Sequence, residues 1–161
     1  MAIVFLSLGG NIGDTRGILV SARRLIGGNI GVIAAESALY TSEPWGFLAD
    51  QNFLNQVIMV DTELSPADVL DHCMLIEAQL GRRRSGKGYA SRPIDIDIIF
   101  YDSLIVGLPN LTIPHPLMHV RNFVLRPLCS IAPRFVHPVL GKTMEQLLVE
   151  SPDRLMCEVA G

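Results

Sequence analysis

The order of predicted strands and helices limits the possible folds of this chain more than any other feature of its sequence. Four segments have the composition and patterning of β-strands, at residues 2–8, 31–41, 53–63 and 95–101. A helix is predicted between the first two strands, with Asp14 as its N-cap and with Gly27 and Gly28 at its end. A second helix begins at Ser65 and Pro66, between the third and fourth strands. The expected order is therefore β-α-β-β-α-β.

This order is typical of a ferredoxin-like sandwich, in which an antiparallel four-stranded sheet carries two helices on one face. We therefore predict a fold of the α+β class. Short elements, several prolines and a last helix near 143–150 follow the fourth strand and form a C-terminal extension. The order of the elements says nothing by itself about function.

Length and composition set limits on the architecture and on the partners. The 161 residues suffice for one hydrophobic core, so we predict a single domain over residues 1–161. Every apolar run is shorter than the ~18 residues that a membrane helix needs. Three cysteines without a CxxC pair indicate reduced thiols in the cytoplasm, and a net charge of −3 argues against a nucleic-acid partner. We expect a cytoplasmic monomer that binds small molecules. We do not expect it to bind nucleic acid or a membrane.

Two acidic residues stand in the most apolar of the predicted strands. In the stretch SRPIDIDIIFYD, period-two alternation places Asp95 and Asp97 on one face and Ile94, Ile96 and Ile98 on the other. Two carboxylates spaced roughly 6.5–7 Å apart along a strand repel each other by about 2 kcal/mol at an effective dielectric near 20. An ordinary solvated strand face would tolerate this repulsion. A basic neighbour or a hard divalent cation such as Mg²⁺ would offset it.

A basic loop directly precedes this strand. Five cations fall within eleven residues, interleaved with glycines: Arg82, Arg83, Arg84, Lys87 and Arg92. Guanidinium groups match phosphate oxygens bidentately, although a charge run is often only a solvated loop. Because Arg92 lies three residues before Asp95, the loop and the acids are predicted to meet at one sheet edge. Such a combination suits a metal–polyphosphate ligand.

Two further motifs contain residues that could carry chemistry. The segment PHPLMHVRNF carries His115, His119, Arg121 and Phe123, which fit a positive, ligand-facing segment better than a zinc site, because the glutamate of HExxH is missing. Structural histidines are the alternative. In GGNIGD, the glycines match no nucleotide-binding motif, so a tight strand-to-helix turn explains them.

An aromatic residue and an amide alternate on one face of the third strand. Phe53 could stack on a flat heterocycle while Asn55, with both a donor and an acceptor, hydrogen-bonds to its edge. Half-buried core residues would give the same pattern.

Several motifs together resemble the 6-hydroxymethyl-7,8-dihydropterin pyrophosphokinases of folate biosynthesis. They are LGGNIGD, EPWG…DQNFLN, IEAQLGRRR, SRPIDIDIIFYD and LTIPHPLMHVRNFVLRPL, in matching order from about residue 3 to residue 140. The resemblance implies transfer of diphosphate from ATP to the pterin hydroxymethyl group, release of AMP, and two Mg²⁺ ions. The chain departs from the usual family pattern at Gly10, Phe53, Tyr89, Ala90-Ser91 and Pro116.

The resemblance also implies roles for individual residues. Asp95 and Asp97 would hold both metal ions, and Arg82, Arg84 and Arg92 would act on the phosphates; these five form the expected catalytic set. ATP would contact Leu70, Glu77, Arg82, Arg84, Arg92, Ile98, Leu111, Thr112, His115 and Arg121. The pterin would contact Pro44, Trp45, Phe53, Asn55, Asp95 and Phe123. The loops 42–52 and 82–92 would close over the substrates as lids that exclude water.

Two other functions fit parts of the sequence. A different two-metal nucleotidyl or phosphoryl transferase on a palm-like sheet would also present paired aspartates to nucleotide phosphates. An RNA-binding module can share the same topology, although paired sheet acids and a sequence pI near 5.7 argue against it.

Overall fold

The computed structural model describes residues 1–82 and 90–161, and its centre is an antiparallel sheet. The sheet follows the order β5-β1-β4-β3-β8, and β2 also pairs with β4. Its strands are β1 (Ala2–Gly10), β2 (Gly31–Glu36), β3 (Tyr40–Ser42), β4 (Phe53–Thr62), β5 (Asp95–Tyr101) and β8 (Cys157–Val159). A separate hairpin consists of β6 (Val106–Leu108) and β7 (Leu111–Ile113).

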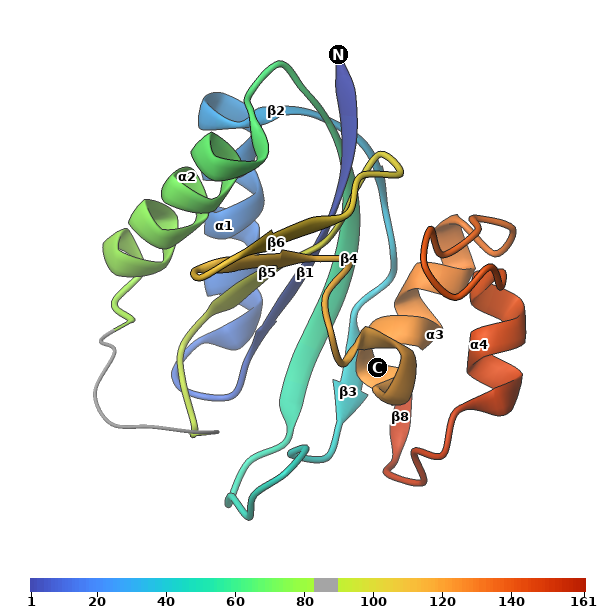
Figure 1. Cartoon of the computed structure of the whole chain (residues 1–161). Helices are drawn as coiled ribbons and strands as arrows, with labels where there is room; N and C mark the ends of the chain where they lie inside the picture. Colours follow the sequence, from blue (N-terminus) through green and yellow to red (C-terminus); the bar gives the residue numbers. More distant parts are fainter. Residues whose placement is uncertain (83–89) are drawn as a thin grey trace.

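Helices cover both faces of the sheet (Figure 1). On one face lie α1 (Thr15–Asn29) and α2 (Pro66–Gln79). On the other face lie the 3-10 turn η1 (Met118–Val120) and the helices α3 (Asn122–Ile131) and α4 (Met144–Glu150). The mixed α/β architecture with antiparallel pairing is as predicted, but the sheet has six strands instead of four, and the C-terminal extension forms a second helical layer on the other face.

Each face of the sheet has its own hydrophobic core, because β1 alternates between them. Leu6 and Leu8 point into the first core, against α1 and α2, whereas Phe5 points into the second, against α3 and α4. The second core also contains Phe100, whose ring meets that of Phe5 edge-to-face at 5.9 Å. The side chain of Ser7 shares the second face with Phe5, and so does the position of Gly9. That face carries the pocket described below.

Helix starts follow the predicted capping, whereas one helix end does not. The Asp14 carboxylate accepts a hydrogen bond from Gly17 N, and the Ser65 hydroxyl accepts one from Asp68 N. However, α1 continues through Gly27 and Gly28 to Asn29. A glycine inside a helix costs about 1 kcal/mol, and the burial of the α1 apolar stripe against the sheet outweighs this cost.

Two other predicted boundaries were also wrong. The segment expected as one strand over 31–41 divides into β2 and β3, and the strand expected at 2–8 continues to Gly10. Among the helices of the described residues, none is long and apolar enough to cross a membrane.

Candidate active site

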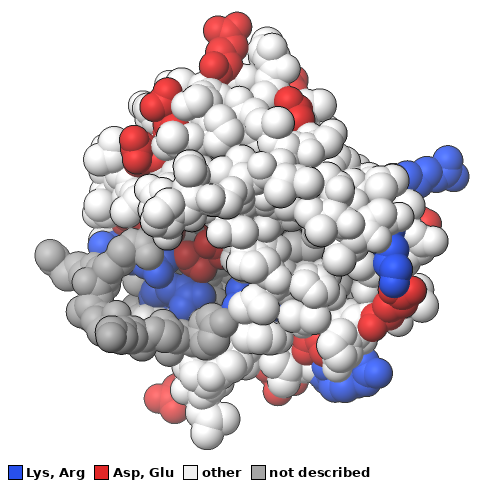
Figure 2. Space-filling model, in the orientation of Figure 1, with Lys and Arg blue, Asp and Glu red and all other residues white. Residues whose placement is uncertain are grey.

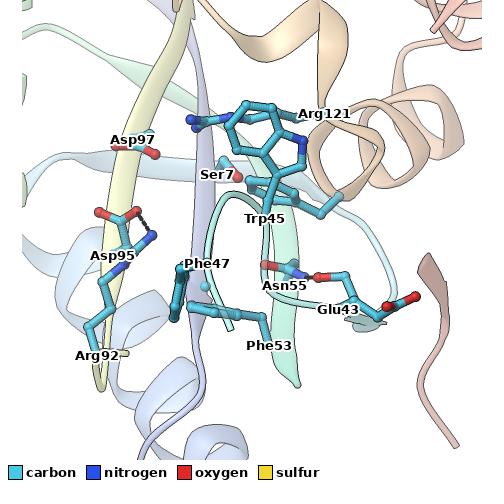
Figure 3. A pocket seen from close by; sticks show the side chains of 13 residues that line it. Ser7, Glu43, Trp45, Phe47, Phe53, Asn55, Arg92, Asp95, Asp97 and Arg121 are labelled. Atoms are coloured by element: carbon cyan, nitrogen blue, oxygen red, sulfur yellow. Dashed lines mark hydrogen bonds and ion pairs between the residues drawn. The ribbon is translucent and has the colours of Figure 1, made fainter. Parts of the chain in front are cut away.

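A pocket opens on the second face of the sheet, where the ends of β1, β4 and β5 meet the start of α3 (Figure 3). The loop between β3 and β4 forms the opposite wall. Thirteen residues line the pocket: Ser7, Gly9, Ser42, Glu43, Trp45, Phe47, Phe53, Asn55, Arg92, Asp95, Asp97, Arg121 and Phe123. Figure 2 shows Lys or Arg side chains next to an Asp or Glu side chain in a hollow on this face of the molecule.

Strand register builds the floor of this pocket. Gly9 of β1 is paired with Asn55 on β4 and with Asp95 on β5, and Ser7 is paired with Asp97. Asp95 and Asp97 point into the pocket while Ile96 and Ile98 belong to the first core. The strand predicted over 95–101 is therefore confirmed, and its two faces alternate as predicted up to Ile98, after which Ile99 and Phe100 both belong to the second core. Small residues on β1 leave the space that the two carboxylates face.

Asp95 is held by two arginines. Arg82 Nη1 donates to Asp95 Oδ1, and Arg92 Nη2 donates to Asp95 Oδ2 at 3.2 Å. Arg82 Nη1 also contacts Glu77 Oε2 at 3.2 Å, and that same oxygen accepts a hydrogen bond from Ile96 N at 2.7 Å. Burial alone would raise the pKa of Asp95, but the charges of Arg92 and Arg82 outweigh it and lower the pKa.

Asp97 is in the opposite situation. Burial, followed by the negative charges of Asp95 and Glu77, raises its pKa to about 8. The one ion pair described for its carboxylate is a contact of 4.0 Å to His115 Nε2, which is too long for a hydrogen bond. The positive charges of Arg121 and Arg92 act against this rise in the pKa of Asp97 but do not cancel it, whereas at Asp95 the arginine charges prevail.

His115 is a neutral donor in this arrangement. Its Nδ1 accepts a hydrogen bond from Leu117 N at 3.2 Å, which places the ring proton on Nε2. Burial, together with the positive charge of Arg121, lowers the pKa of His115 to about 4. At neutral pH the ring therefore presents an N–H toward Asp97 without a positive charge.

Aromatic rings and arginines form the upper walls. The rings of Phe47 and Phe53 meet edge-to-face at 5.9 Å, and Arg92 Cζ lies 5.2 Å from the centre of the Phe53 ring. On the other side, Arg121 Cζ lies 4.5 Å from the centre of the Trp45 ring and 5.6 Å from that of Phe123. The geometry offers flat apolar surfaces beside fixed positive charges, as a heterocycle with an anionic partner would need.

The amide of Asn55 is held in one orientation. Its Nδ2 donates to Ser42 Oγ at 2.6 Å, and a Cβ at Gly9 would approach Asn55 Oδ1 to 2.8 Å. The oxygen therefore faces the floor beside Gly9, and a Cβ at that position would displace it. Phe53 and Asn55 share one face of β4, as predicted.

Several residues predicted for the site lie outside this pocket. Leu70 contacts the first core, and Ile98 and Leu111 belong to it with 5% and 7% of their surface exposed. Thr112 lines a separate apolar groove together with His115, His119 and His137. Pro44 is half-buried but does not line the pocket. Arg83, Arg84, Lys87 and Tyr89 lie outside the described residues.

Other lining residues were not predicted. Strand pairing places Ser7 and Gly9 at the pocket. The end of β3 and the loop that follows it bring in Ser42, Glu43 and Phe47. The glycines of GGNIGD were misassigned in part: Gly9 and Gly10 belong to β1, and only Gly13 has the positive φ (77°) of a turn. Gly10 is required by a close approach, since a Cβ there would lie 2.1 Å from Pro93 O.

Asn11 joins the segments on both sides of the pocket and was also missed. Its backbone N donates to Arg92 O and its Oδ1 accepts from Arg92 N, both at 2.9 Å. Its Nδ2 contacts Ser91 Oγ at 3.0 Å and Gln51 O at 3.3 Å. Asn11 therefore fixes the backbone from which the Arg92 side chain projects.

Replacing Asn11 with alanine is expected to destabilise the protein by about 2 kcal/mol, because Arg92 N loses its acceptor in a part-buried position. For a chain of this size the midpoint of thermal unfolding should fall by about 4–8 °C, measured by circular dichroism. Asn29→Ala is the matched control, because the Asn29 amide donates to Leu25 O at the exposed end of α1. Equal shifts for the two variants would contradict a bridging role for Asn11.

The described residues contain no group of three or more histidine, cysteine, aspartate or glutamate side chains suited to hold a metal ion. The pocket provides two carboxylates as oxygen ligands, and His115, which lines the neighbouring groove, directs an N–H and no free nitrogen lone pair toward Asp97. Magnesium is commonly held by one or two carboxylates with water and substrate phosphates completing the shell, so the donor set fits that ion better than a protein-enclosed metal.

Comparison with known proteins gives the family. The model of the 7,8-dihydro-6-hydroxymethylpterin-pyrophosphokinase family matches residues 5–133. The chain belongs to this family. The 2-amino-4-hydroxy-6-hydroxymethyldihydropteridine pyrophosphokinase of Porphyromonas gingivalis (strain ATCC 33277) is 43% identical over 141 residues, which cover 86% of this chain and 95% of that protein. The enzyme of the same name from Methylorubrum extorquens is 38% identical over 93% of this chain and 94% of its own length.

Longer relatives contain a similar segment. The folic acid synthesis protein FOL1 of Dictyostelium discoideum is 40% identical over 94% of this chain, which spans 23% of that protein. A crystal structure of wild-type Plasmodium falciparum HPPK-DHPS matches with a TM-score of 0.75 and 18% identity, covering 92% of this chain and 44% of that one. The chain thus has the fold of these pyrophosphokinase structures and spans less than half of their length.

Proposed function

We propose that this chain transfers the diphosphate of ATP to the hydroxymethyl group of 6-hydroxymethyl-7,8-dihydropterin and releases AMP, in folate biosynthesis. Membership of the pyrophosphokinase family supports the reaction. The observation that carries the proposal is the joint placement of Asp95 and Asp97 on one face, directly beside the aromatic walls of the pocket. Diphosphate transfer needs a polyanion and a flat acceptor to meet in this way.

Asp95 and Asp97 would hold two Mg²⁺ ions. The raised pKa of Asp97 supports this role, because a half-buried carboxyl with negative neighbours is stabilised by a cation. When bound, magnesium neutralises charge on the phosphates and acidifies a hydroxyl that it contacts. The protein supplies the hard oxygen donors and the adjoining small residues on β1.

The cations beside the pair would handle the phosphates. Arg82 and Arg92 reach Asp95 from two sides, so their guanidinium groups lie where a metal-bound polyphosphate would extend. His115 would donate a hydrogen bond from its Nε2 N–H to a phosphate oxygen without adding a full charge. Arg121 would contact the phosphates from the opposite wall. The sequence resemblance assigns Arg84 to the same set of phosphate-binding cations. Positioning and electrostatic stabilisation account for most of the rate in such a transfer.

The pterin would lie against Phe53 and Phe123, with Trp45 and the loop around Pro44 above it. The fixed Asn55 amide directs its oxygen to the floor, where it would accept a hydrogen bond from a ring N–H. Asp95 would reach the hydroxymethyl end. The nucleoside part of ATP would contact Leu70, Glu77, Ile98, Leu111 and Thr112 along the outer side of β5, through the little surface that Ile98 and Leu111 expose.

The wider assignments are part of the same proposal. The strand order β5-β1-β4 followed by β2 and β3 supports a ferredoxin-like core within one domain over residues 1–161. The protein would act as a cytoplasmic monomer on small molecules and would not bind nucleic acid. The loops 42–52 and 82–92 would close over the substrates; the second is largely outside the described residues.

The test is a product analysis with ATP and 6-hydroxymethyl-7,8-dihydropterin, with and without Mg²⁺. We expect AMP and the diphosphorylated pterin in equal amounts, only when all three components are present. Free pyrophosphate would instead indicate a nucleotidyl transferase, and ADP an ordinary kinase. Either of these products, or no turnover with magnesium, would refute the proposal.

A further inference from the structure

The start of α3 carries two pocket side chains but is not capped from within. Arg121 stands at the N-cap position, and its side chain makes no capping hydrogen bond. Phe123 follows at the second residue of the helix. Because the orientation of the first turn decides where both side chains point, whatever satisfies its backbone N–H groups also determines their position.

Asp153, 31 residues further along the chain, satisfies this helix start. Its Oδ2 accepts a hydrogen bond from Asn122 N at 2.8 Å, and its backbone O accepts one from Asn122 Nδ2 at 3.3 Å. The other carboxylate oxygen accepts from Leu155 N at 3.0 Å, and the backbone N of Asp153 donates to Ser151 Oγ. The carboxylate is therefore itself fixed, and its negative charge lies at the favourable end of the α3 dipole.

The same segment also holds the opposite wall of the pocket. Glu43 Oε1 accepts a hydrogen bond from Met156 N at 2.7 Å, and Glu43 N donates to Met156 O at 3.1 Å. Glu43 begins the loop that carries Trp45. Residues 151–157 thus touch the base of one wall and the start of the other, although they lie outside the residues 5–133 that the family model matches.

We propose that Asp153 is a positioning residue of the active site, which sets the orientation of Arg121 and Phe123 by capping α3 from the C-terminal segment. The proposal builds on the proposed function, since it assigns these side chains to substrate binding. Its geometric part can be tested independently: Trp45 is the only tryptophan of the chain and lies 4.5 Å from Arg121 Cζ. Its emission therefore reports changes around the Trp45 ring, including the position of Arg121.

The experiment compares Asp153→Ala with Asp153→Asn and with Thr143→Ala. Thr143 caps α4 through Gln146 N, away from the pocket, and serves as the matched loss of a helix cap. We expect Asp153→Ala to change the Trp45 emission of the native protein and to raise the KM for the pterin about tenfold or more, with a smaller effect on kcat. Asp153→Asn, which retains an acceptor for Asn122 N, should restore most of both properties. Thr143→Ala should lower the unfolding temperature and leave both unchanged.

Two outcomes would overturn the proposal. One is an Asp153→Ala protein that is less stable but has wild-type emission and KM, which would make the contact purely structural. The other is an equal change in Thr143→Ala, which would make the effect a general response to destabilisation. A wild-type protein without diphosphate transfer would refute the proposed function alone, because the emission comparison of the three variants needs no substrate.

Discussion

Asp97→Asn is expected to abolish diphosphate transfer and, at the same time, to make the metal-free protein more stable. The amide keeps the size of the side chain but removes the negative charge that would bind Mg²⁺. Because metal ions supply several kcal/mol of charge stabilisation in such reactions, kcat should fall at least about 10³-fold at saturating Mg²⁺. Replacing a residue that serves the fold lowers the stability of the protein. Replacing a residue that serves function often raises it.

The stability gain should depend on pH in a defined direction. The pKa of Asp97 is about 8 in the folded protein, against an ordinary value of 3.8. Between these values the folded state binds more protons than the unfolded state, so the stability of the wild type falls as the pH rises from about 4 to about 8. The amide of the variant cannot ionise and escapes this loss. The advantage of the variant should thus be absent below pH 4 and largest above pH 8.

The size of the gain is limited by solvent. The Asp97 side chain is 35% exposed, so screening reduces the interaction, and we expect about 1 kcal/mol, or about 3 °C in unfolding temperature at pH 8.5. Thermal unfolding at pH 4 and pH 8.5 without metal measures it. Asp71→Asn on the exposed side of α2 is the control and should change neither property. Near-normal turnover of Asp97→Asn at high Mg²⁺ would exclude a metal role for this residue.

Arg92→Ala is expected to reduce kcat by about 10²-fold while weakening pterin binding much less. The guanidinium contacts Asp95 Oδ2 at 3.2 Å and donates to Ala90 O at 2.7 Å, so it is oriented toward the acid pair before any ligand arrives. Its contact with the Phe53 ring predicts a modest loss of pterin affinity as well. Stabilisation of the negative charge on the transferred diphosphate in the transition state needs the full guanidinium group. The effect on kcat should therefore be the larger one.

Steady-state kinetics and equilibrium binding of the pterin separate the two effects. Arg92→Lys keeps the charge but loses the two-pronged geometry and should recover only part of kcat. Arg24→Ala, on the exposed side of α1, is the control for removing a positive charge elsewhere. If Arg92→Ala lost pterin affinity with kcat unchanged, the assignment to the phosphates would be wrong.

Local patterning predicted the central elements of the fold. The bounds of β5 agree with the predicted strand at 95–101, and both helix starts follow from Asp14 and Ser65. By contrast, α3 has no capping side chain of its own and contains Pro127, so its sequence argues against a helix. It forms because Val124, Leu125 and Leu128 bury against the second face of the sheet. Tertiary packing of this kind is not visible in local propensity.

The site divides in the same way. The alternation along one strand sufficed to place Asp95 and Asp97 on one face, and the nearby arginines were expected to reach them, as Arg82 and Arg92 do at Asp95. Ser7 could not be foreseen, because it reaches the pocket only through the pairing register of β1 with β5, two strands far apart in the chain. Asn11 and Asp153 act through hydrogen bonds across 81 and 31 residues, for which the sequence offers no local signal. The roles of the individual site residues stay predictions until they are tested.

The place of β1 in the sheet has a consequence for selectivity. This strand is hydrogen-bonded on both sides along its length, by β4 and by β5, and both cores hold it. The pocket floor that β1 forms cannot move to admit a larger ligand without disrupting the whole molecule. Only the rim of the pocket can adapt to differently shaped compounds, because Trp45, Phe47 and Phe123 come from a loop and a helix start. Inhibitors should therefore tolerate added bulk toward these rings but not toward Ser7 and Gly9.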